Sequence, residues 1–277
     1  MKKSRIFFMI FILLSTTFIL AEHSASCSPT DTSSKTVESF LTLANSTIIE
    51  ISNEGSFTTG IKAHSFCVDN EAKLLFTLNE IYDYSSGKFL LLRTYDSLTG
   101  GYIYAGFGII ASVHNDTDDI DFYDYDGNFI KTIEFSGNPV ILQSAYGIFL
   151  DNNTFLLSED GYNNVIKVNI SDGTAEIFKS FDFGWLGVFA KHEDSYYIYT
   201  SAGNAIYKFS ASTDPVLIDD GFPAHVTGIV AEESILYFVS NFGNGFYSYN
   251  MESGELTKIA DLNYPQGLYK ITYNVLF

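Results

Sequence analysis

The chain has 277 residues, of which 33 are acidic and 15 basic, so its formal net charge is −18. A surface of that sign repels nucleic acid and anionic membranes, which argues against a nucleic-acid-binding role. Two cysteines are too few for a disulfide scaffold. From composition alone we therefore expect a soluble acidic domain with no nucleic-acid partner and no cofactor.

The first residues have the pattern of a secretory signal peptide. Lys2, Lys3 and Arg5 precede an apolar run over 6–20, and small residues follow it. The run is too short and wrongly flanked for a stable spanning helix. We predict a signal peptide over 1–26 and an extracytoplasmic protein, either secreted, periplasmic or on the cell surface. Its removal leaves 12 basic and 32 acidic residues, a net charge near −20.

The segment after the apolar run allows two kinds of processing. Ser24–Ser26 before Cys27 resembles a bacterial lipobox, although Ser24 stands where Leu is usual. Cys27 is thus a candidate lipidation site, and a lipid there is the sole membrane attachment that we expect. The alternative is ordinary cleavage after Ala21, Ala25 or Ser26. We assign residues 27–44 to a polar tether and lead-in, because 28–35 has no capacity for a core.

Beyond residue 45 the chain repeats a unit of about forty residues. A polar-polar-Gly turn recurs in each unit, where glycine permits positive φ without steric cost. A small residue opens the first strand of each unit, and in three units it precedes the turn glycine by the same 26 residues. The turn glycines are Gly55, Gly87, Gly127, Gly173 and Gly254, and the opening residues are Ser65, Gly101, Gly147, Gly187, Gly228 and Gly267.

Each unit reads as four short strands. After Gly147 they are GIFLD, TFLLSED, NVIKVNI and TAEIFKSF, which alternate or run apolar and are bounded by Asn, Asp, Gly and Ser. No convincing amphipathic helix follows residue 47. Four-stranded units at this period predict an all-β fold, the β-propeller. Cys67 falls in a first strand, so we expect a buried inert thiol; a bridge to Cys27 requires that Cys27 carry no lipid.

The two ends of the repeat are complementary. After Gly267 only ten residues remain, and they match the first two strands of the preceding unit. Residues 47–60 supply a strand, a turn and a strand, which match the last two. We therefore predict six blades in a single domain over 45–277, with the ring closed by N-terminal strands pairing with C-terminal strands, which removes exposed edges.

The register of the repeat places several chemically versatile side chains on one loop face. His64, Tyr146, Trp185 and His225 precede first strands, and His114, Asp116 and Asp160 lie between second and third strands. Imidazole with carboxylate is reasonable ligation for a divalent metal. Two other interpretations stay open. The residues are scattered solvated loop residues, or they form an aromatic and polar patch for an organic ligand or peptide. We name these seven residues as candidate binding residues and assign no metal ligand.

Two segments carry a family resemblance. DFYDYDGNFIKTI (121–133) and ILYFVSNFGNGFYSYNMESG (235–254) resemble six-bladed propellers of the NHL and YWTD repeat kind. The resemblance implies mostly interaction modules, with some enzymes. The similar lactonases of the gluconolactonase type use a Glu and Asn/Asp set introduced by an early E-G-P segment, which this chain lacks. We therefore carry over no catalytic residue.

These observations favour a non-catalytic, monomeric module that binds a protein, peptide or glycan through its loop face. The alternative is a metal-assisted hydrolase or lactonase with a site over the central channel, using His64, His114 or His225 with Asp116 or Asp160. A third hypothesis is a purely structural surface component. Of the three, only the hydrolase hypothesis predicts stoichiometric metal in purified protein and turnover that depends on channel residues.

Overall fold

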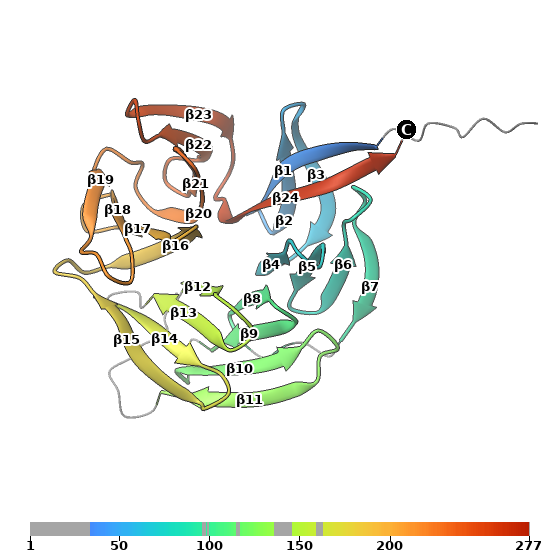
Figure 1. Ribbon diagram of the computed structural model, residues 1–277. Helices are drawn as coiled ribbons and strands as arrows, with labels where there is room; N and C mark the ends of the chain where they lie inside the picture. The colour runs from blue at the N-terminus through green and yellow to red at the C-terminus, as the bar shows by residue number, and fades with distance from the viewer. Residues whose placement is uncertain are drawn as a thin grey trace, which may run out of the picture. The chain divides into compact units, whose positions relative to one another are not determined.

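The computed structural model describes residues 34–95, 98, 100–114, 117–135, 146–158 and 163–276. They form strands grouped in six four-stranded antiparallel sheets, which stand as blades around a centre (Figure 1). The predicted all-β, six-bladed propeller is confirmed. Across the described residues, no helix has the length and apolar character needed to span a bilayer.

Five blades follow the chain in order, and their first strands stand innermost (Figure 1). Blade 1 is β4(Phe66–Asp69), β5(Leu74–Thr77), β6(Glu80–Asp83) and β7(Leu90–Thr94). Blade 2 is β8(Tyr102–Gly106), β9(Ile109–Val113), β10(Asp119–Asp124) and β11(Phe129–Glu134). Blade 3 is β12(Tyr146–Phe149), β13(Thr154–Ser158), β14(Asn164–Asn169) and β15(Thr174–Ser180). Blade 4 is β16(Leu186–His192), β17(Ser195–Thr200), β18(Ala205–Phe209) and β19(Val216–Asp219), and blade 5 is β20(Val226–Glu232), β21(Ile235–Ser240), β22(Gly245–Asn250) and β23(Glu255–Asp261).

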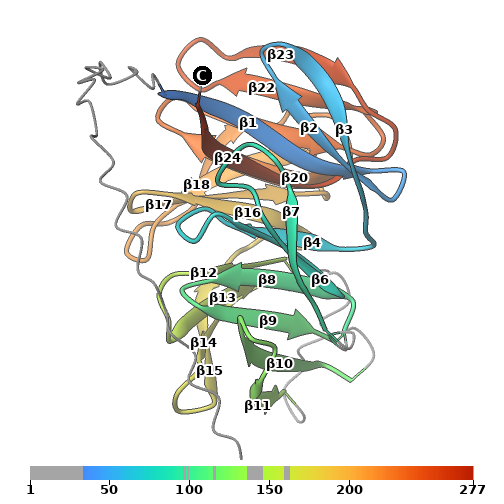
Figure 2. The ribbon, with the colours of Figure 1, turned by 90° about the vertical axis from the view of Figure 1, so that its right-hand side faces the viewer.

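The closing blade combines both ends of the described chain. It consists of β24(Gln266–Leu276), β1(Ser34–Ala44), β2(Thr47–Ser52) and β3(Gly55–Lys62), in that order. Figure 2 shows β1 and β24 side by side, and their register runs antiparallel from Ser34 opposite Leu276 to Leu43 opposite Gln266. Closure by N-terminal strands pairing with C-terminal strands is confirmed.

The division of strands in the closing blade differs from the expectation. The C-terminal segment forms one long strand instead of two short ones, and the N-terminal segment contributes three strands instead of two. Residues 34–44, assigned from sequence to the tether and lead-in, form β1. Its second half is apolar and buried at Leu41, Leu43 and Ala44, so it fills the place beside β24 and moves the start of the propeller from residue 45 to Ser34.

Alternation along the strands builds the core between blades. In β13, Phe155 and Leu157 join the apolar cluster shared with blade 2, whereas Leu156 between them joins the cluster shared with blade 4. Successive side chains of a strand point to opposite faces of the sheet, so each blade supplies one face to each neighbour. Six such clusters occupy the six junctions of the ring.

Small residues at the start of first strands let inner strands approach. A Cβ on Gly228 would lie 2.4 Å from the backbone nitrogen of Leu268 in the next blade. Beside it, the hydroxyl of Thr227 donates to the carbonyl of Pro265 at 2.6 Å, and the hydroxyl of Ser158 donates to the carbonyl of Gly187 at 2.9 Å. At Gly228 the opening marker of the repeat thus reflects contact between neighbouring blades, whereas at Gly147 and Gly187 the small residue leaves room for an aromatic ring of its own blade, Phe155 and Tyr199.

Cys67 lies in β4 and is 1% exposed. Burial raises the pKa of its thiol well above the ordinary value, and the Asp69 carboxylate raises it further. The thiol is therefore protonated at neutral pH and unreactive, as expected from its position in a first strand. Cys27 and the predicted signal peptide lie outside the described residues.

The turn glycines of the repeat adopt the positive φ expected of them: Gly87, Gly127, Gly173 and Gly254 have φ of 75°, 82°, 67° and 71°. In the turn of blade 2, the Asp124 carboxylate accepts from the backbone N–H groups of Asp126 at 2.9 Å and Asn128 at 2.8 Å. It also accepts from the side-chain amide of Asn128 at 2.8 Å. These bonds, with the amide of Asn128 contributing most, lower the pKa of Asp124.

We expect Asp124→Ala to reduce the free energy of unfolding by about 1 kcal/mol at pH 7, because the turn loses its acceptor. A carboxyl with a lowered folded-state pKa stabilises above its unfolded pKa of about 3.9 and loses that contribution as pH falls through the folded value. The difference between wild type and variant should therefore shrink as pH falls from about 6 to below 3. Urea unfolding at several pH values measures it, and a difference that grows on acidification would contradict this account.

Candidate functional site

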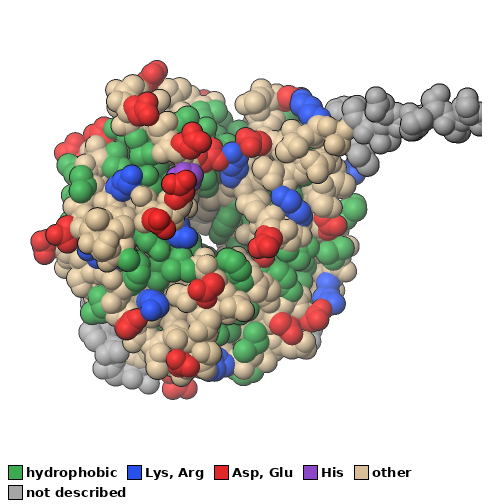
Figure 3. Space-filling model, in the orientation of Figure 1, with side chains coloured by type: hydrophobic (Ala, Val, Ile, Leu, Met, Phe, Trp, Pro, Cys, Tyr) green, Lys and Arg blue, Asp and Glu red, His purple; other side chains and the backbone are tan. Residues whose placement is uncertain are grey.

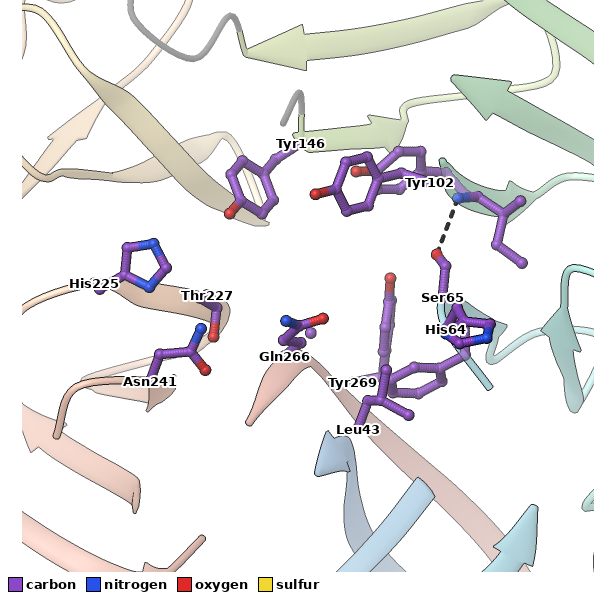
Figure 4. Close-up of a pocket in the computed structure, with 14 residues that line it drawn as sticks. Leu43, His64, Ser65, Tyr102, Tyr146, His225, Thr227, Asn241, Gln266 and Tyr269 are labelled. Carbon is purple, nitrogen blue, oxygen red and sulfur yellow. Dashed lines mark hydrogen bonds between the residues drawn. The ribbon is translucent and has the colours of Figure 1, made fainter. Parts of the chain in front are cut away.

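A cavity of about 180 Å³ opens where the inner strands begin, at the mouth of the central channel. Figure 4 shows His225, Asn241, Gln266, Tyr146, Tyr102 and Tyr269 extending towards one open centre. The cavity is built by the first strands of blades 1, 2, 3, 5 and the closing blade, by residues just before β4 and β20, and by Leu43 of β1 and Asn241 after β21. Its lining is Leu43, His64, Ser65, Phe66, Tyr102, Ile103, Tyr104, Tyr146, His225, Thr227, Asn241, Gln266, Gly267 and Tyr269.

Tyrosines of the inner strands form the wall that continues into the channel. Tyr104, Tyr146 and Tyr269 line both this cavity and the adjoining hollow further along the channel. Burial raises the pKa of Tyr104 well above its ordinary value, and the nearby hydroxyls of Tyr269, Tyr146 and Tyr102 raise it further. Burial also raises the pKa of Tyr269. The phenols of Tyr104 and Tyr269 therefore stay neutral, and they offer hydroxyl groups without charge.

Asn241 carries a buried polar atom without a partner. The residue follows β21, is 8% exposed, and its Oδ1 makes no hydrogen bond within the described residues. The backbone N–H of Asn241 donates to the carbonyl of His225 at 3.1 Å, which fixes the residue at the cavity wall. An unpaired buried acceptor costs about 1–3 kcal/mol. A fold that retains such an atom at a cavity wall holds it ready for a donor from outside.

His225 is held in a sparsely populated backbone conformation. Its φ is 59°, in the left-handed region that favours glycine. The backbone N–H of His225 donates to the hydroxyl of Tyr199 at 2.9 Å, and its ring stacks on Phe242 with centroids 5.0 Å apart. These contacts determine where the imidazole lies beside Asn241. Backbone strain of this kind, about 1–3 kcal/mol, is concentrated at ligand sites.

Exposed aromatic side chains border the loop face. Phe242, stacked on His225, is 70% exposed, and Tyr264 is 65% exposed. Tyr264 lines a second hollow that shares His64 and Gln266 with the cavity. Exposed rings next to a polar cavity are the arrangement found at recognition surfaces, where rigid aromatic area contributes most of the binding energy.

The cavity differs in charge from the rest of the molecule. Carboxylates are spread over the face drawn in Figure 3, as expected for a chain with a net charge of −18. Among the described residues that line the cavity, none is Asp, Glu, Lys or Arg. Its polar groups are instead amides, hydroxyls and two imidazoles. Such groups both donate and accept hydrogen bonds without carrying a fixed charge.

The structure brings three of the seven candidate residues together. His64, Tyr146 and His225, from three blades, all line the cavity, as does Gln266. Trp185 precedes β16 and is 60% exposed, but it does not line the cavity. His114 is also apart from it, because its Nε2 lies 3.0 Å from the Asp121 carboxylate within blade 2. Asp116 and Asp160 lie outside the described residues.

Sequence reasoning missed the residue with the clearest site chemistry. The loop over 241–244 follows β21, and its last residue, Asn244, adopts φ of 46° and is not part of the cavity lining. Asn241, at the end of the preceding strand, lines the cavity instead. Tyr102 and Tyr269 also line the cavity, because inner-strand positions near the loop face border the channel. The available signal was polar or tyrosine residues at the loop-face ends of strands.

A metal site has no support among the described residues, where no three His, Cys, Asp or Glu side chains gather closely enough to hold an ion. His64 and His225 share the cavity, but no described carboxylate lines it with them. The alternative of a metal-assisted hydrolase pairs these histidines with Asp116 or Asp160, which lie outside the described residues.

We expect Asn241→Leu to leave Tm unchanged or raise it, because the change removes a buried acceptor that lacks a partner. Thr227→Val is the matched comparison in the same wall. Its hydroxyl donates to the carbonyl of Pro265, so its loss should cost about 1 kcal/mol. Thermal unfolding of both variants measures the difference. A loss of more than about 1 kcal/mol in Asn241→Leu would show that the amide stabilises the fold.

The chain matches no family model and no curated protein. Its fold is similar to that of a chain from the crystal structure of a nidogen/laminin complex, with a TM-score of 0.66. The two chains are 9% identical, and the match covers 84% of this chain and 98% of the other. At that identity the likeness shows the fold alone, and the fold defines this chain as a β-propeller.

Proposed function

We propose that this protein is a non-catalytic extracytoplasmic binding module that recognises a protein, peptide or glycan through the loop face around the channel mouth. One observation carries the proposal: Asn241 Oδ1, buried and without a partner among the described residues, lies with His64, Tyr146 and His225 in the wall of a cavity whose described lining has no Asp, Glu, Lys or Arg. Convergent polar groups in a preformed hollow are the usual signature of a ligand site.

Two further features support the proposal. The similar solved chain comes from a complex of nidogen with laminin, so a propeller of this shape occurs in a protein that forms a complex. The apolar run over 6–20, preceded by Lys2, Lys3 and Arg5, favours export. We assign the repeats to the NHL and YWTD kind on the phrases over 121–133 and 235–254, and we retain Cys27 as the candidate lipid attachment site.

Selection of ligands by the purified propeller tests the proposal. A random-peptide display library and an oligosaccharide array would be probed with the wild type and with two double variants. Phe242→Ser with Tyr264→Ser alters the loop face. Phe57→Ser with Phe129→Ser alters outer strands, where the rings are 51% and 59% exposed. We expect ligands selected by the wild type to be retained by the outer-strand variant and lost by the loop-face variant.

Two results would overturn this function. The first is binding that survives the loop-face change and disappears with the outer-strand change. The second is turnover of esters or lactones by protein purified without chelator, with stoichiometric metal that is lost on replacing His225 or Asp116. That second result would establish the hydrolase alternative, in which imidazole and carboxylate hold a metal that activates water.

A further inference from the structure

We propose that the channel-mouth cavity binds the neutral end of a carbohydrate chain, with one pyranose unit inside the cavity and the following units on the aromatic rim. The inference rests on the proposed function, because it names the ligand class of the same site. It is carried by four properties of the cavity: its charge, its hydrogen-bonding groups, its rim and its size.

The charge of the cavity selects against ionised ligands. The described lining contains no Lys or Arg to pair with a carboxylate, phosphate or sulfate and no Asp or Glu to pair with an amine, and its two histidines carry no fixed charge. An ionised group placed there would lose its hydration without gaining a fixed counter-charge, which is unfavourable. The net charge of −18 further repels anions. The ligand group that enters is therefore uncharged.

The hydrogen-bonding groups of the wall match hydroxyl-rich ligands. Asn241 Oδ1 is a buried acceptor that needs a donor, and Gln266 presents a second amide (Figure 4). His64 and His225 each offer one donor and one acceptor when neutral. A sugar hydroxyl both donates and accepts, so neighbouring hydroxyls of one ring can satisfy such a wall. An apolar ligand of the same size would leave Oδ1 unpaired.

The rim supplies flat apolar surface next to the polar wall. Phe242 is stacked on His225, and Tyr264 borders the hollow that shares His64 and Gln266 with the cavity. Both rings are largely exposed, at 70% and 65%. The axial C–H groups of a pyranose form an apolar face of ring size, so a sugar unit outside the cavity can cover either ring while its hydroxyls stay in water. The removal of that apolar area from water is favourable.

The size of the cavity indicates the end of a chain. At about 180 Å³, it is smaller than the roughly 300 Å³ at which pockets begin to enclose drug-sized ligands. It therefore admits one ring-sized unit, and the exposed rings of Phe242 and Tyr264 offer surface for the units that follow. A terminal sugar fits this requirement without charge. A peptide terminus carries an amine or a carboxylate, for which the described lining has no Asp, Glu, Lys or Arg.

An array of neutral and anionic oligosaccharides tests the inference, with the neutral set covering gluco-, galacto-, manno- and N-acetylhexosamine trisaccharides. Affinity for the strongest neutral trisaccharide would then be measured by titration calorimetry. We expect Asn241→Leu to weaken it about tenfold or more, because one sugar hydroxyl loses its acceptor. Asn53→Leu, an exposed amide in the turn between β2 and β3, and Phe57→Ala are the matched controls. They should leave affinity within about twofold.

The outcomes separate this inference from the function on which it rests. Failure of every neutral trisaccharide, with selected peptides still lost by the loop-face variant, overturns the carbohydrate inference and leaves the binding function. Stronger binding of sialylated or sulfated chains contradicts the charge argument, and neutral binding that is indifferent to Asn241→Leu contradicts the location. If neither peptides nor saccharides bind, the carbohydrate inference and the proposed function both fail.

Discussion

A chain that begins at Thr47 should fail to form the closed propeller, whereas a chain that begins at Ser34 should fold. The shorter chain lacks β1, which pairs with β2 on one side and with β24 on the other. It also lacks the buried Leu41 and Leu43, which pack into the junction with blade 1. Two large apolar side chains contribute about 3–6 kcal/mol by burial, comparable with the roughly 5–15 kcal/mol of net stability of a typical domain.

Because β1 lies inside the sheet that closes the ring, its deletion should cost more stability than the deletion of an edge strand. Without β1, the inner strand β24 has no neighbour within its sheet, and β2 presents a free edge inside the ring. Urea unfolding, near-ultraviolet circular dichroism and size-exclusion chromatography of the two chains measure the effect. Leu41→Ala in the longer chain should cost about 2–5 kcal/mol and tests the same contact without a deletion. Equal cooperativity and midpoints for both chains would contradict the observed closure and favour closure by two strands from each end.

The second large effect is expected at Gly228, where blade 5 meets the closing blade. A Cβ there would lie 2.4 Å from the backbone nitrogen of Leu268 and 2.5 Å from the backbone carbon of Gly267. Both atoms belong to β24, which pairs with β1 and cannot move without disturbing the closing sheet. We expect Gly228→Ala to reduce the free energy of unfolding by about 3 kcal/mol or more, because overpacking here meets backbone instead of a flexible side chain.

Gly203→Ala is the matched control. Gly203 lies in an exposed turn of blade 4, its φ is outside the left-handed range, and its nearest neighbour would be the Cβ of Ala205 at 3.8 Å. That change should alter stability by no more than about 0.5 kcal/mol. Urea unfolding of both variants makes the comparison. Similar midpoints for Gly228→Ala and the wild type would show that the inner strands can separate without cost.

Much of the fold could be predicted because its signals are local. The turn glycines need positive φ, and Gly127 and Gly173 have it. The alternation in TFLLSED places Phe155 and Leu157 on one face and Leu156 on the other. These features depend only on the steric limits of the backbone and on the period of a strand. Repetition at a fixed spacing then extended them to six blades.

Long-range pairing decided what local patterns could not. Half of β1 is polar, so its sequence from Ser34 resembles a tether, and only pairing with β24 makes it a strand. The cavity depends on the same closure, because it sets His64 of blade 1 beside Gln266 of the closing blade and His225 of blade 5. Whether Asn241 Oδ1 finds a partner depends on every group packed around it. The sequence by itself determined the blades and their loop face, whereas tertiary structure decided which loop residues meet, since non-local contacts determine how the ring closes.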